Sequence, residues 1–304
     1  MKIKKYLPHL MLLGAAAIWG FAFVAQDMVE GIGANTVVAA RSYIASLFLL
    51  ILIPAMDKLR HTERKLISRD GIDISRSELI GGAICGVCLA VASVLQQMGI
   101  QSGTDGGKAA FITSLYVILV PIYALTIKKR APINVWCAVG VAAVGFYLLC
   151  IKESVGIAPS DIFVACGALI FPVHILAIDH FSPKCDGVRM SFIQFVTCAI
   201  VETVVALIIE SPIDPSMVWQ NILPLLFLGI GSSGIAYTLQ IFGQNGPDPA
   251  AASIIMSLES VFGVIGTAIF LGSILEVREY IGCFIVLAAV ILSQLEFKKN
   301  TRKK

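Results

Sequence analysis

Charged side chains inside long apolar stretches are the residues of this sequence that could do chemistry. Glu259 lies about ten residues from either end of the apolar run 250–271, and Arg41 lies about two turns into the run 35–55. A charge at the centre of a membrane span costs roughly 2.5–3.5 kcal/mol on insertion scales, so it usually marks a functional site or a buried pair. We therefore predict that Glu259 binds substrate or a proton, and that Arg41 attracts an anionic substrate group or pairs with a carboxylate.

Each of these predictions has a structural alternative. Glu259 could be a carboxyl that is neutral or hydrogen-bonded between helices. Arg41 could pair with Glu259 or Glu202, or form a local pair with Asp27 or Glu30. Glu202 is the weaker candidate for a site because its side chain could extend toward the membrane surface.

Three further residues have unusual positions for their type. Tyr116 and Trp19 lie well inside apolar runs, whereas aromatic residues with a polar atom are usually enriched at the membrane surface. His174 lies in the middle of the run 161–180, where it could take up a proton or pack as a neutral residue. We add all three to the predicted substrate or proton site.

Glutamines recur in two equivalent pairs. Gln97 and Gln101 are four residues apart, as are Gln240 and Gln244, so each pair shares one helix face. We predict that the two pairs line a cavity or its gates. Capping of helix ends beside the neighbouring glycine-containing loops is the alternative.

Motifs for catalysis, metal binding or nucleotide binding do not emerge from the sequence. The segment 103–108 (GTDGGK) has three residues between its outer glycines instead of four, and Ala109 stands where a phosphate loop needs serine or threonine. Cys85 and Cys88 form a C-x-x-C spacing inside an apolar run, without a second pair, and we interpret them as packing residues. We predict no enzyme activity, no cofactor and no metal.

The composition indicates which elements position these residues. The chain has 304 residues, of which 57% are hydrophobic and 14% charged, and its mean hydropathy is +0.86. Soluble domains are about one quarter charged, so an ordinary soluble protein is excluded, and the net charge of +3 does not indicate nucleic-acid binding. Ten apolar runs are about as long as a membrane span: 8–26, 35–55, 79–101, 109–127, 133–151, 161–180, 190–209, 220–243, 250–271 and 280–295. We predict an all-α membrane protein, a bundle of ten helices in the lipid bilayer.

The distribution of lysine and arginine predicts the orientation. With the N-terminus in the cytoplasm, 19 of these residues lie in inner segments and two, Lys152 and Arg278, lie in outer ones. Basic residues are enriched in cytoplasmic loops. We expect a multi-pass protein of the cytoplasmic (plasma) membrane with both termini inside.

The chain also contains a repeat. A shift of 143 residues overlays 86–116 on 229–259 with nine identities in 31 positions, among them Gln97/Gln240 and Asp105/Asp248. A shift of 153 places Arg41 over Gln194. Because each unit would have five spans, an odd number, the second unit must enter the membrane from the opposite side. We predict two inverted units, 8–151 and 161–296, followed by a basic cytoplasmic tail, 297–304; such inverted repeats are typical of secondary transporters.

In five segments, and across 10–295 as a whole, the sequence resembles the EamA-like family of the drug/metabolite transporter superfamily. The segments are 18–20 (IWG), 40–41 (AR), 95–101 (LQQMGIQ), 107–121 (GKAAFITSLYVILVP) and 257–266 (SLESVFGVIG) followed by 270–272 (FLG). The family often has proline where this chain has Ser260, and glutamate where it has Ser273. The resemblance implies a transporter with two EamA-like repeats and favours export.

Together, these patterns predict a secondary active transporter of small metabolites, such as amino acids or drug-like compounds, that works by alternating access. In the absence of nucleotide-binding motifs, a proton or substrate gradient would drive transport, with Glu259 as the proton carrier. A channel, an intramembrane enzyme and a non-transporting scaffold are the alternatives. The substrate and the oligomeric state are not predicted.

Overall fold

The computed structural model describes residues 3–59, 67–68, 71–150, 158–271 and 276–295, so Ser273 and the tail 297–304 lie outside the described residues. The first half contains α1 (Ile3–Asp27), α2 (Ala34–Leu59), β1 (Ile67–Ser68), β2 (Gly71–Ile72), α3 (Arg76–Gln101), α4 (Gly106–Ser114), α5 (Tyr116–Thr126) and α6 (Ile133–Cys150). The second half contains α7 (Pro159–Phe181), η1 (Ser182–Lys184), α8 (Gly187–Ile209), α9 (Pro215–Gln220), α10 (Ile222–Leu226), the π-helix η2 (Phe227–Ala236), α11 (Tyr237–Gly243), α12 (Pro249–Met256), α13 (Glu259–Leu271) and α14 (Val277–Gln294).

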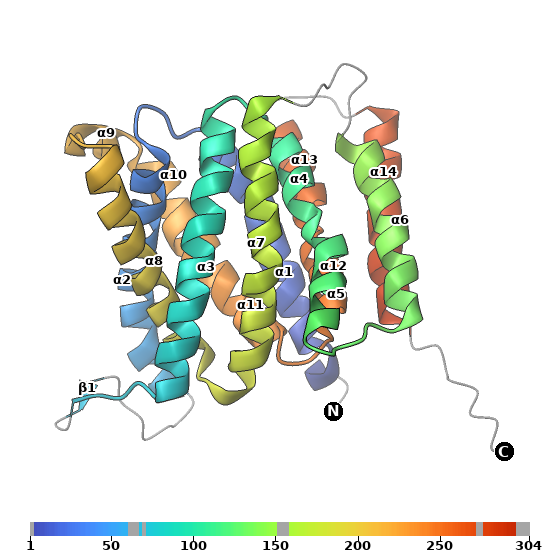
Figure 1. Cartoon of the computed structure of the whole chain (residues 1–304), viewed down its shortest axis with the longest axis horizontal. Helices are drawn as coiled ribbons and strands as arrows, with labels where there is room; N and C mark the ends of the chain where they lie inside the picture. Colours follow the sequence, from blue (N-terminus) through green and yellow to red (C-terminus); the bar gives the residue numbers. More distant parts are fainter. Residues whose placement is uncertain (1–2, 60–66, 69–70, 151–157, 272–275, 296–304) are drawn as a thin grey trace.

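The predicted all-α membrane bundle is confirmed. In the described part of the chain, nine helical spans are long and apolar enough to cross a membrane, and a tenth, Ile133–Leu149, is shorter. Successive spans alternate in direction (Figure 1), so α1 and α7, which begin the two halves, run in opposite directions. The two halves are therefore inverted with respect to each other. α1 begins and α14 ends at the same end of the bundle, and β1 lies at this end too. We name it the basic end.

Three spans that the sequence predicts as continuous helices are interrupted. The run 109–127 divides into α4 and α5 at Leu115, and the run 250–271 divides into α12 and α13 after Met256. Tight turns mark both interruptions, because the amides of Leu115 and Leu258 bond to carbonyls three residues earlier. These two leucines are equivalent in the 143-residue repeat. The third interrupted span changes from α10 to the π-helix η2 and then to α11.

Close helix packing follows the same symmetry. A Cβ atom on Gly86 would lie 2.5 Å from the carbonyl oxygen of Gln194, and one on Gly229 would lie 3.0 Å from the carbonyl oxygen of Arg41. Gly86 and Gly229 are repeat equivalents, and so are Gln194 and Arg41. Glycine thus allows α3 to approach α8 as closely as η2 approaches α2.

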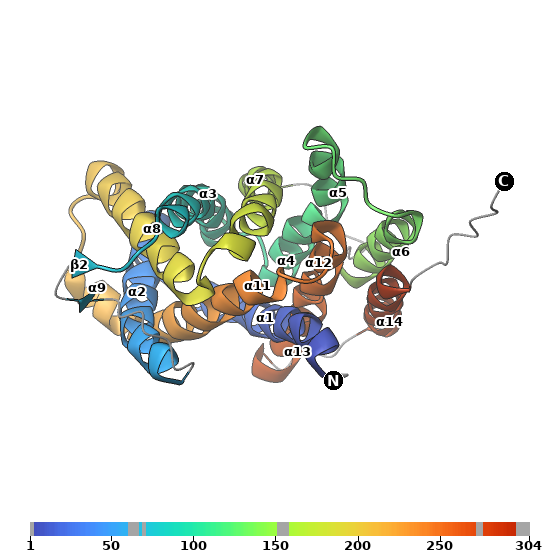
Figure 2. The ribbon, with the colours of Figure 1, turned by 90° about the horizontal axis from the view of Figure 1, so that it is seen from below.

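The packing leaves a central group of spans and a peripheral pair. α6 and α14 pack on each other at one edge of the bundle, and α2, α8 and α9 form the opposite edge (Figure 2). α1 lies between these edges and contacts η2, α11 and α13. The interrupted spans therefore surround α1 at the middle of the molecule.

Candidate functional site

A cavity of about 50 Å³ lies among the central spans. Its volume suffices for a few water molecules. The lining residues come from both halves of the chain: Trp19, Ala22, Phe23 and Gln26 of α1; Arg41; Gln96; Thr113; Tyr116; Phe171, His174 and Ile175 of α7; Ser232; Tyr237 and Gln240 of α11; Met256; and Glu259. All five residues that we predicted as the substrate or proton site line this cavity.

Glu259 and Tyr116 are positioned by the two helix interruptions. Each is the first residue of the helix after the break, Tyr116 in α5 and Glu259 in α13. The Tyr116 hydroxyl neighbours the Glu259 carboxyl. Neither that hydroxyl nor Glu259 Oε1 has a hydrogen bond of ordinary geometry, although both are buried.

The interruptions are held against each other and against α1. The hydroxyls of Ser114 and Ser260 are hydrogen-bonded, and Ser260 Oγ also lies 3.3 Å from the carbonyl oxygen of Ala110. A Cβ atom on Gly20 of α1 would lie 2.7 Å from the carbonyl oxygen of Glu259, so only glycine allows this approach. The span of α12 and α13 is thus interrupted even though Ser260 replaces the proline that is frequent in the EamA-like family.

Arg41 is a buried cation that forms no ion pair within 4 Å with a carboxylate of the described residues. Its side chain is 3% exposed, and its Nη2 donates a hydrogen bond of 3.1 Å to Ser93 Oγ. Its Nε atom is buried without a partner. Among the described residues, Arg41 forms none of the ion pairs that we considered for it, neither with Glu259 and Glu202 nor with the carboxylates at the end of α1.

Aromatic rings form one wall of the cavity. The ring centroids of Trp19 and Tyr237 are 4.7 Å apart, and His174 packs edge-on against Tyr237 at 5.7 Å. Trp19 Nε1 donates to the carbonyl oxygen of Ser232 in the π-helix at 3.2 Å. His174 Nε2 lies 3.0 Å from Gln194 Oε1. His174 therefore has a hydrogen-bond partner while one side of its ring faces the cavity.

The four predicted glutamines occupy different environments. Gln240 lines the cavity, and its Oε1 is buried without a partner. Gln97, Gln101 and Gln244 donate to backbone carbonyls of Gln26, Ile32 and Ile175, respectively. Three glutamines therefore connect neighbouring segments, and one faces the cavity.

Tyr237 and Gln26 are among the lining residues that were not singled out from the sequence. Tyr237 contacts Trp19, His174 and Phe195, which makes it the centre of the aromatic wall. Gln26 has a buried Oε1 without a partner at the end of α1. Tyr237 carries the same sequence signal as Tyr116, a tyrosine well inside an apolar run, and that signal would have identified it.

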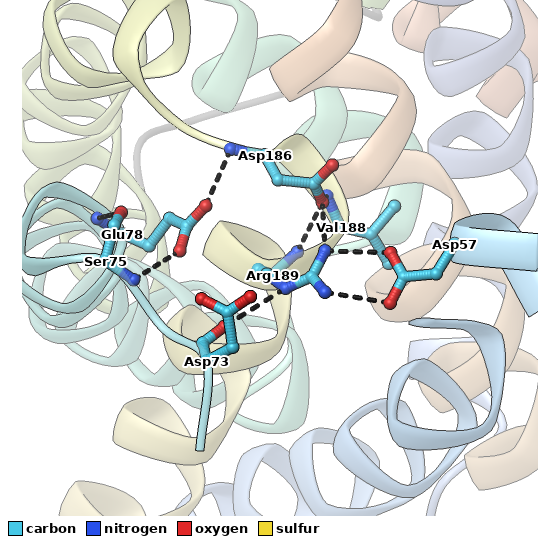
Figure 3. A network of polar contacts seen from close by, with 7 residues as sticks. All are labelled: Asp57, Asp73, Ser75, Glu78, Asp186, Val188 and Arg189. Atoms are coloured by element: carbon cyan, nitrogen blue, oxygen red, sulfur yellow. Dashed lines mark hydrogen bonds and ion pairs between the residues drawn. The ribbon is translucent and has the colours of Figure 1, made fainter. Parts of the chain in front are cut away.

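At the basic end, a charged network joins α2 to α8 (Figure 3). Arg189 donates two hydrogen bonds to Asp57, Nη1 to Oδ1 at 2.9 Å and Nη2 to Oδ2 at 2.8 Å, while its Nε reaches the carbonyl oxygen of Asp73 at 3.3 Å. Glu78 accepts a hydrogen bond from the amide of Asp186 at 3.0 Å. Arg189 is 1% exposed. We name the Asp57–Arg189 pair the basic-end clamp.

A second carboxylate joins the same two helices at the opposite end. Glu210, directly after α8, accepts four hydrogen bonds of 2.7–2.9 Å from the amides and side chains of Asn35 and Thr36 at the start of α2. Partial burial opposes ionisation of Glu210, but these hydrogen bonds outweigh it and lower its pKa. We name this arrangement the opposite-end clamp.

Further contacts join α7 to neighbouring segments at both ends of the bundle. Lys108 at the start of α4 pairs with Asp161 at the start of α7 at 2.5 Å, and Thr104 also donates to Asp161. At the basic end, Lys129 pairs with Asp179. These two pairs therefore join α7 to the interrupted span of α4 and α5 at both ends of the bundle. Among the described residues, no cluster of three histidine, cysteine or acidic side chains could hold a metal ion.

Comparisons with known proteins agree with this architecture. The sequence model of the EamA-like transporter family matches residues 7–151 and 158–295. A relative from Archaeoglobus fulgidus, described as an uncharacterized transporter, is 29% identical over 301 residues, which cover 96% of this chain and 87% of the relative. A solved crystal structure superposes with a TM-score of 0.73 and 16% identity, covering 94% of this chain and 96% of the other, and this likeness supports the fold alone.

Proposed function

The chain belongs to the EamA-like transporter family, and from that premise we propose that it is a secondary active transporter of small metabolites, such as amino acids or drug-like compounds. The observation that carries the proposal is the cavity at the middle of the bundle. Arg41 and Glu259 line it without an ion-pair partner among the described residues, and Trp19 and Tyr237 form its aromatic wall.

The side chains of the cavity fit a small molecule with both a charged and an apolar part. Arg41 offers an unpaired Nε atom to an anionic group such as a carboxylate. Glu259 offers an acceptor to an ammonium group or to a proton. The rings of Trp19 and Tyr237 offer apolar surface and a face for a cation. A zwitterionic amino acid with an apolar side chain satisfies all three features.

Transport would proceed by alternating access. A cavity of about 50 Å³ is too small for such a substrate, so binding requires contacts at one end of the bundle to open. Because the two halves are inverted equivalents, the same rearrangement carried out by the other half would open the other end. The substrate would then leave on the side opposite to the one from which it entered.

Glu259 is our candidate for coupling transport to a proton. A buried carboxylate without a cation beside it is costly, and protonation removes that cost. Substrate with an ammonium group and a proton would compete for this carboxyl. The transporter would therefore exchange proton for substrate.

We also propose an orientation and a domain organisation. The 19 lysines and arginines of the predicted inner segments favour a basic end in the cytoplasm, with the protein in the plasma membrane. In that orientation, residues 8–151 and 161–296 form the two repeats and 297–304 form a cytoplasmic tail. The family resemblance favours export.

A transport assay in proteoliposomes tests the proposal. Counterflow of radiolabelled amino acids is measured with the wild type, Arg41→Gln and Glu259→Gln, at several pH values on both sides. We expect saturable uptake in the wild type, a loss of tenfold or more in Arg41→Gln, and uptake without pH dependence in Glu259→Gln. Arg278→Gln, at the end of the bundle beside the exposed Glu276, serves as the matched control and should behave like the wild type.

The alternatives give different results in the same assay. A channel would give flux that does not saturate with substrate concentration. A scaffold would give neither flux nor stabilisation by any ligand in a thermal screen of amino acids, amines, sugars and nucleosides. Unchanged pH dependence in Glu259→Gln would remove Glu259 from the coupling role.

A further inference from the structure

A second hollow, separate from the cavity, lies between α5 and α7 near the basic end. This groove has a volume of about 660 Å³. It is lined by Tyr123, Thr126, Ile127 and Lys129 on one side and by Val173, Leu176, Ala177, His180 and Phe181 on the other. On α7, His174 and Ile175 face the cavity instead. The groove is thus formed by the helix faces that point away from the proposed transport site.

The groove becomes more polar toward the end of the bundle. Val173, Leu176 and Ala177 form its apolar wall, and Val173 and Ile127 are 44% and 51% exposed on the surface that would contact lipid. Lys129 and His180 lie at its basic end. From Val173 to His180 the wall is about two helical turns long, roughly 10 Å. Apolar walls below a polar rim match the acyl chain and headgroup of a phospholipid.

The segment that follows α5, which contributes Lys129 to the groove, is strongly basic. Lys128, Lys129 and Arg130 follow α5 and are exposed. Lys129 pairs with Asp179, and Asp248 is the other acidic group near this pair. No carboxylate contacts Lys128 or Arg130 within the described residues. Lys128 and Arg130 flank the groove-lining Lys129 in the chain, and these two exposed cations are therefore available to an anionic headgroup.

The backbone at Lys128 supports a role for its charge. Lys128 has a φ of 62°, in the left-handed region. The Lys128 amide donates to the carbonyl oxygen of Leu125, and the Lys129 amide donates to the carbonyl oxygen of Ala124. The end of α5 therefore forms a Schellman motif. Glycine is the residue that favours the left-handed position of this motif. Lysine therefore stands here at a conformational cost.

From the groove, its polarity and its cations, we propose that the mouth between α5 and α7 binds an anionic phospholipid, with an acyl chain along Val173 and Ala177 and the phosphate near Lys128 and Arg130. A zwitterionic lipid carries a compensating cation and would gain less from this rim. A free phosphate ion would use the cations but leave the apolar groove unfilled.

Native mass spectrometry of the purified full chain tests this site. Phosphatidylglycerol, phosphatidylcholine of the same acyl chains and glycerol 3-phosphate are added in separate titrations. We expect phosphatidylglycerol to bind at least tenfold more tightly than phosphatidylcholine, and glycerol 3-phosphate to show no specific binding. The double variant Lys128→Gly/Arg130→Gln should lose this preference, since each cation near anionic lipid contributes several-fold in affinity.

Two further variants keep the result interpretable. Lys128→Gly removes charge while relieving the left-handed strain, so a loss of binding with unchanged thermal stability cannot be attributed to misfolding. Val173→Phe fills the apolar wall and should weaken phosphatidylglycerol binding without changing charge. Lys58→Gln, an exposed lysine in the last turn of α2, is the control and should bind like the wild type. Equal binding of phosphatidylglycerol and phosphatidylcholine would overturn the proposal. So would a loss of phosphatidylglycerol binding in Lys58→Gln as large as that in the double variant. Tight binding of glycerol 3-phosphate would also overturn it, because the ligand would then be a soluble phosphate compound.

Discussion

The basic-end and opposite-end clamps occupy equivalent positions but are chemically different. Asp57 and Glu210 are 153 residues apart, as are Thr36 and Arg189, so each clamp joins a carboxylate at the end of one helix to the start of the other. The basic-end clamp is a buried charge pair between Asp57 and Arg189. The opposite-end clamp uses only neutral donors, the amides and side chains of Asn35 and Thr36.

This difference shows how an inverted repeat adapts to a bilayer with two unlike sides. The position of the carboxylate is kept in both halves, but only Glu210 accepts from backbone amides at the start of the neighbouring helix, whereas Asp57 accepts from the side chain of Arg189. The donor differs, and the arginine occurs at the end of the bundle where lysine and arginine are concentrated. We therefore expect the two clamps to contribute unequally to stability.

The largest effect is expected from Arg189→Met. This variant leaves the Asp57 carboxylate, whose side chain is 11% exposed, without its partner. Removing one member of a buried ion pair typically destabilises a protein by about 3–5 kcal/mol. Unfolding in detergent, followed by tryptophan fluorescence, measures the loss. A cost no larger than that of Arg278→Gln, which breaks a more exposed pair with Glu276, would contradict the assigned role of the basic-end clamp.

A smaller effect is expected from Glu210→Ala. The variant removes four hydrogen bonds and leaves the start of α2 uncapped, which we expect to cost about 1–3 kcal/mol. Glu210→Gln retains an acceptor oxygen and should cost less than alanine. The same unfolding measurement applies. If Glu210→Ala were as costly as Arg189→Met, the proposed inequality between the clamps would be wrong.

The repeat-equivalent glycines allow a similar comparison away from the clamps. Gly86→Ala places a Cβ atom 2.5 Å from the backbone oxygen of Gln194, whereas the nearest atoms for Gly229→Ala belong to the side chain of Ile44. Overpacking of this kind costs about 1–3 kcal/mol. We expect the Gly86 variant to lose more, because a backbone carbonyl can move less than a side chain. An unchanged stability of both variants would argue against the close approach of the helices at these positions.

The smallest expected effect is a dependence on pH. The hydrogen bonds of the opposite-end clamp lower the pKa of Glu210 below its ordinary value of 4.5. The stabilisation that the ionised group contributes is therefore fully present above pH 4.5 and is lost as the pH falls through the lower pKa of the folded state. The stability difference between wild type and Glu210→Gln should shrink below pH 4.5. A difference that is constant between pH 3 and 7 would show that the charge of Glu210 does not matter.

The sequence predicts the fold well because its signals are strong ones. Ten long apolar runs, the asymmetric distribution of basic residues and the 143-residue overlay each follow from composition and spacing. The interruptions at Leu115 and Leu258 were not predicted, because neither glycine nor proline stands at either position. They arise where two spans meet at Ser114 and Ser260, a contact that is visible only in three dimensions.

The candidate site was predictable where a residue is exceptional for its surroundings. Glu259 and Arg41 stand out because charge is rare in apolar runs, and both line the cavity. Tyr237 lies well inside an apolar run, as Tyr116 does, but its place at the centre of the aromatic wall depends on Trp19 and His174 from other spans. Arg189 could be counted as a basic residue near the membrane surface, but its partner lies 132 positions away in the chain.

Accessibility of the cavity from the two sides of the membrane tests the central claim most directly. A cysteine is placed at Met256, which lines the cavity and is 1% exposed, in a background where the exposed Cys137 and Cys166 are replaced by serine. An impermeant thiol reagent is added to proteoliposomes from one side or the other. Alternating access predicts labelling from both sides, with a rate that changes when substrate is present. Labelling from one side only, under every substrate condition, would contradict it.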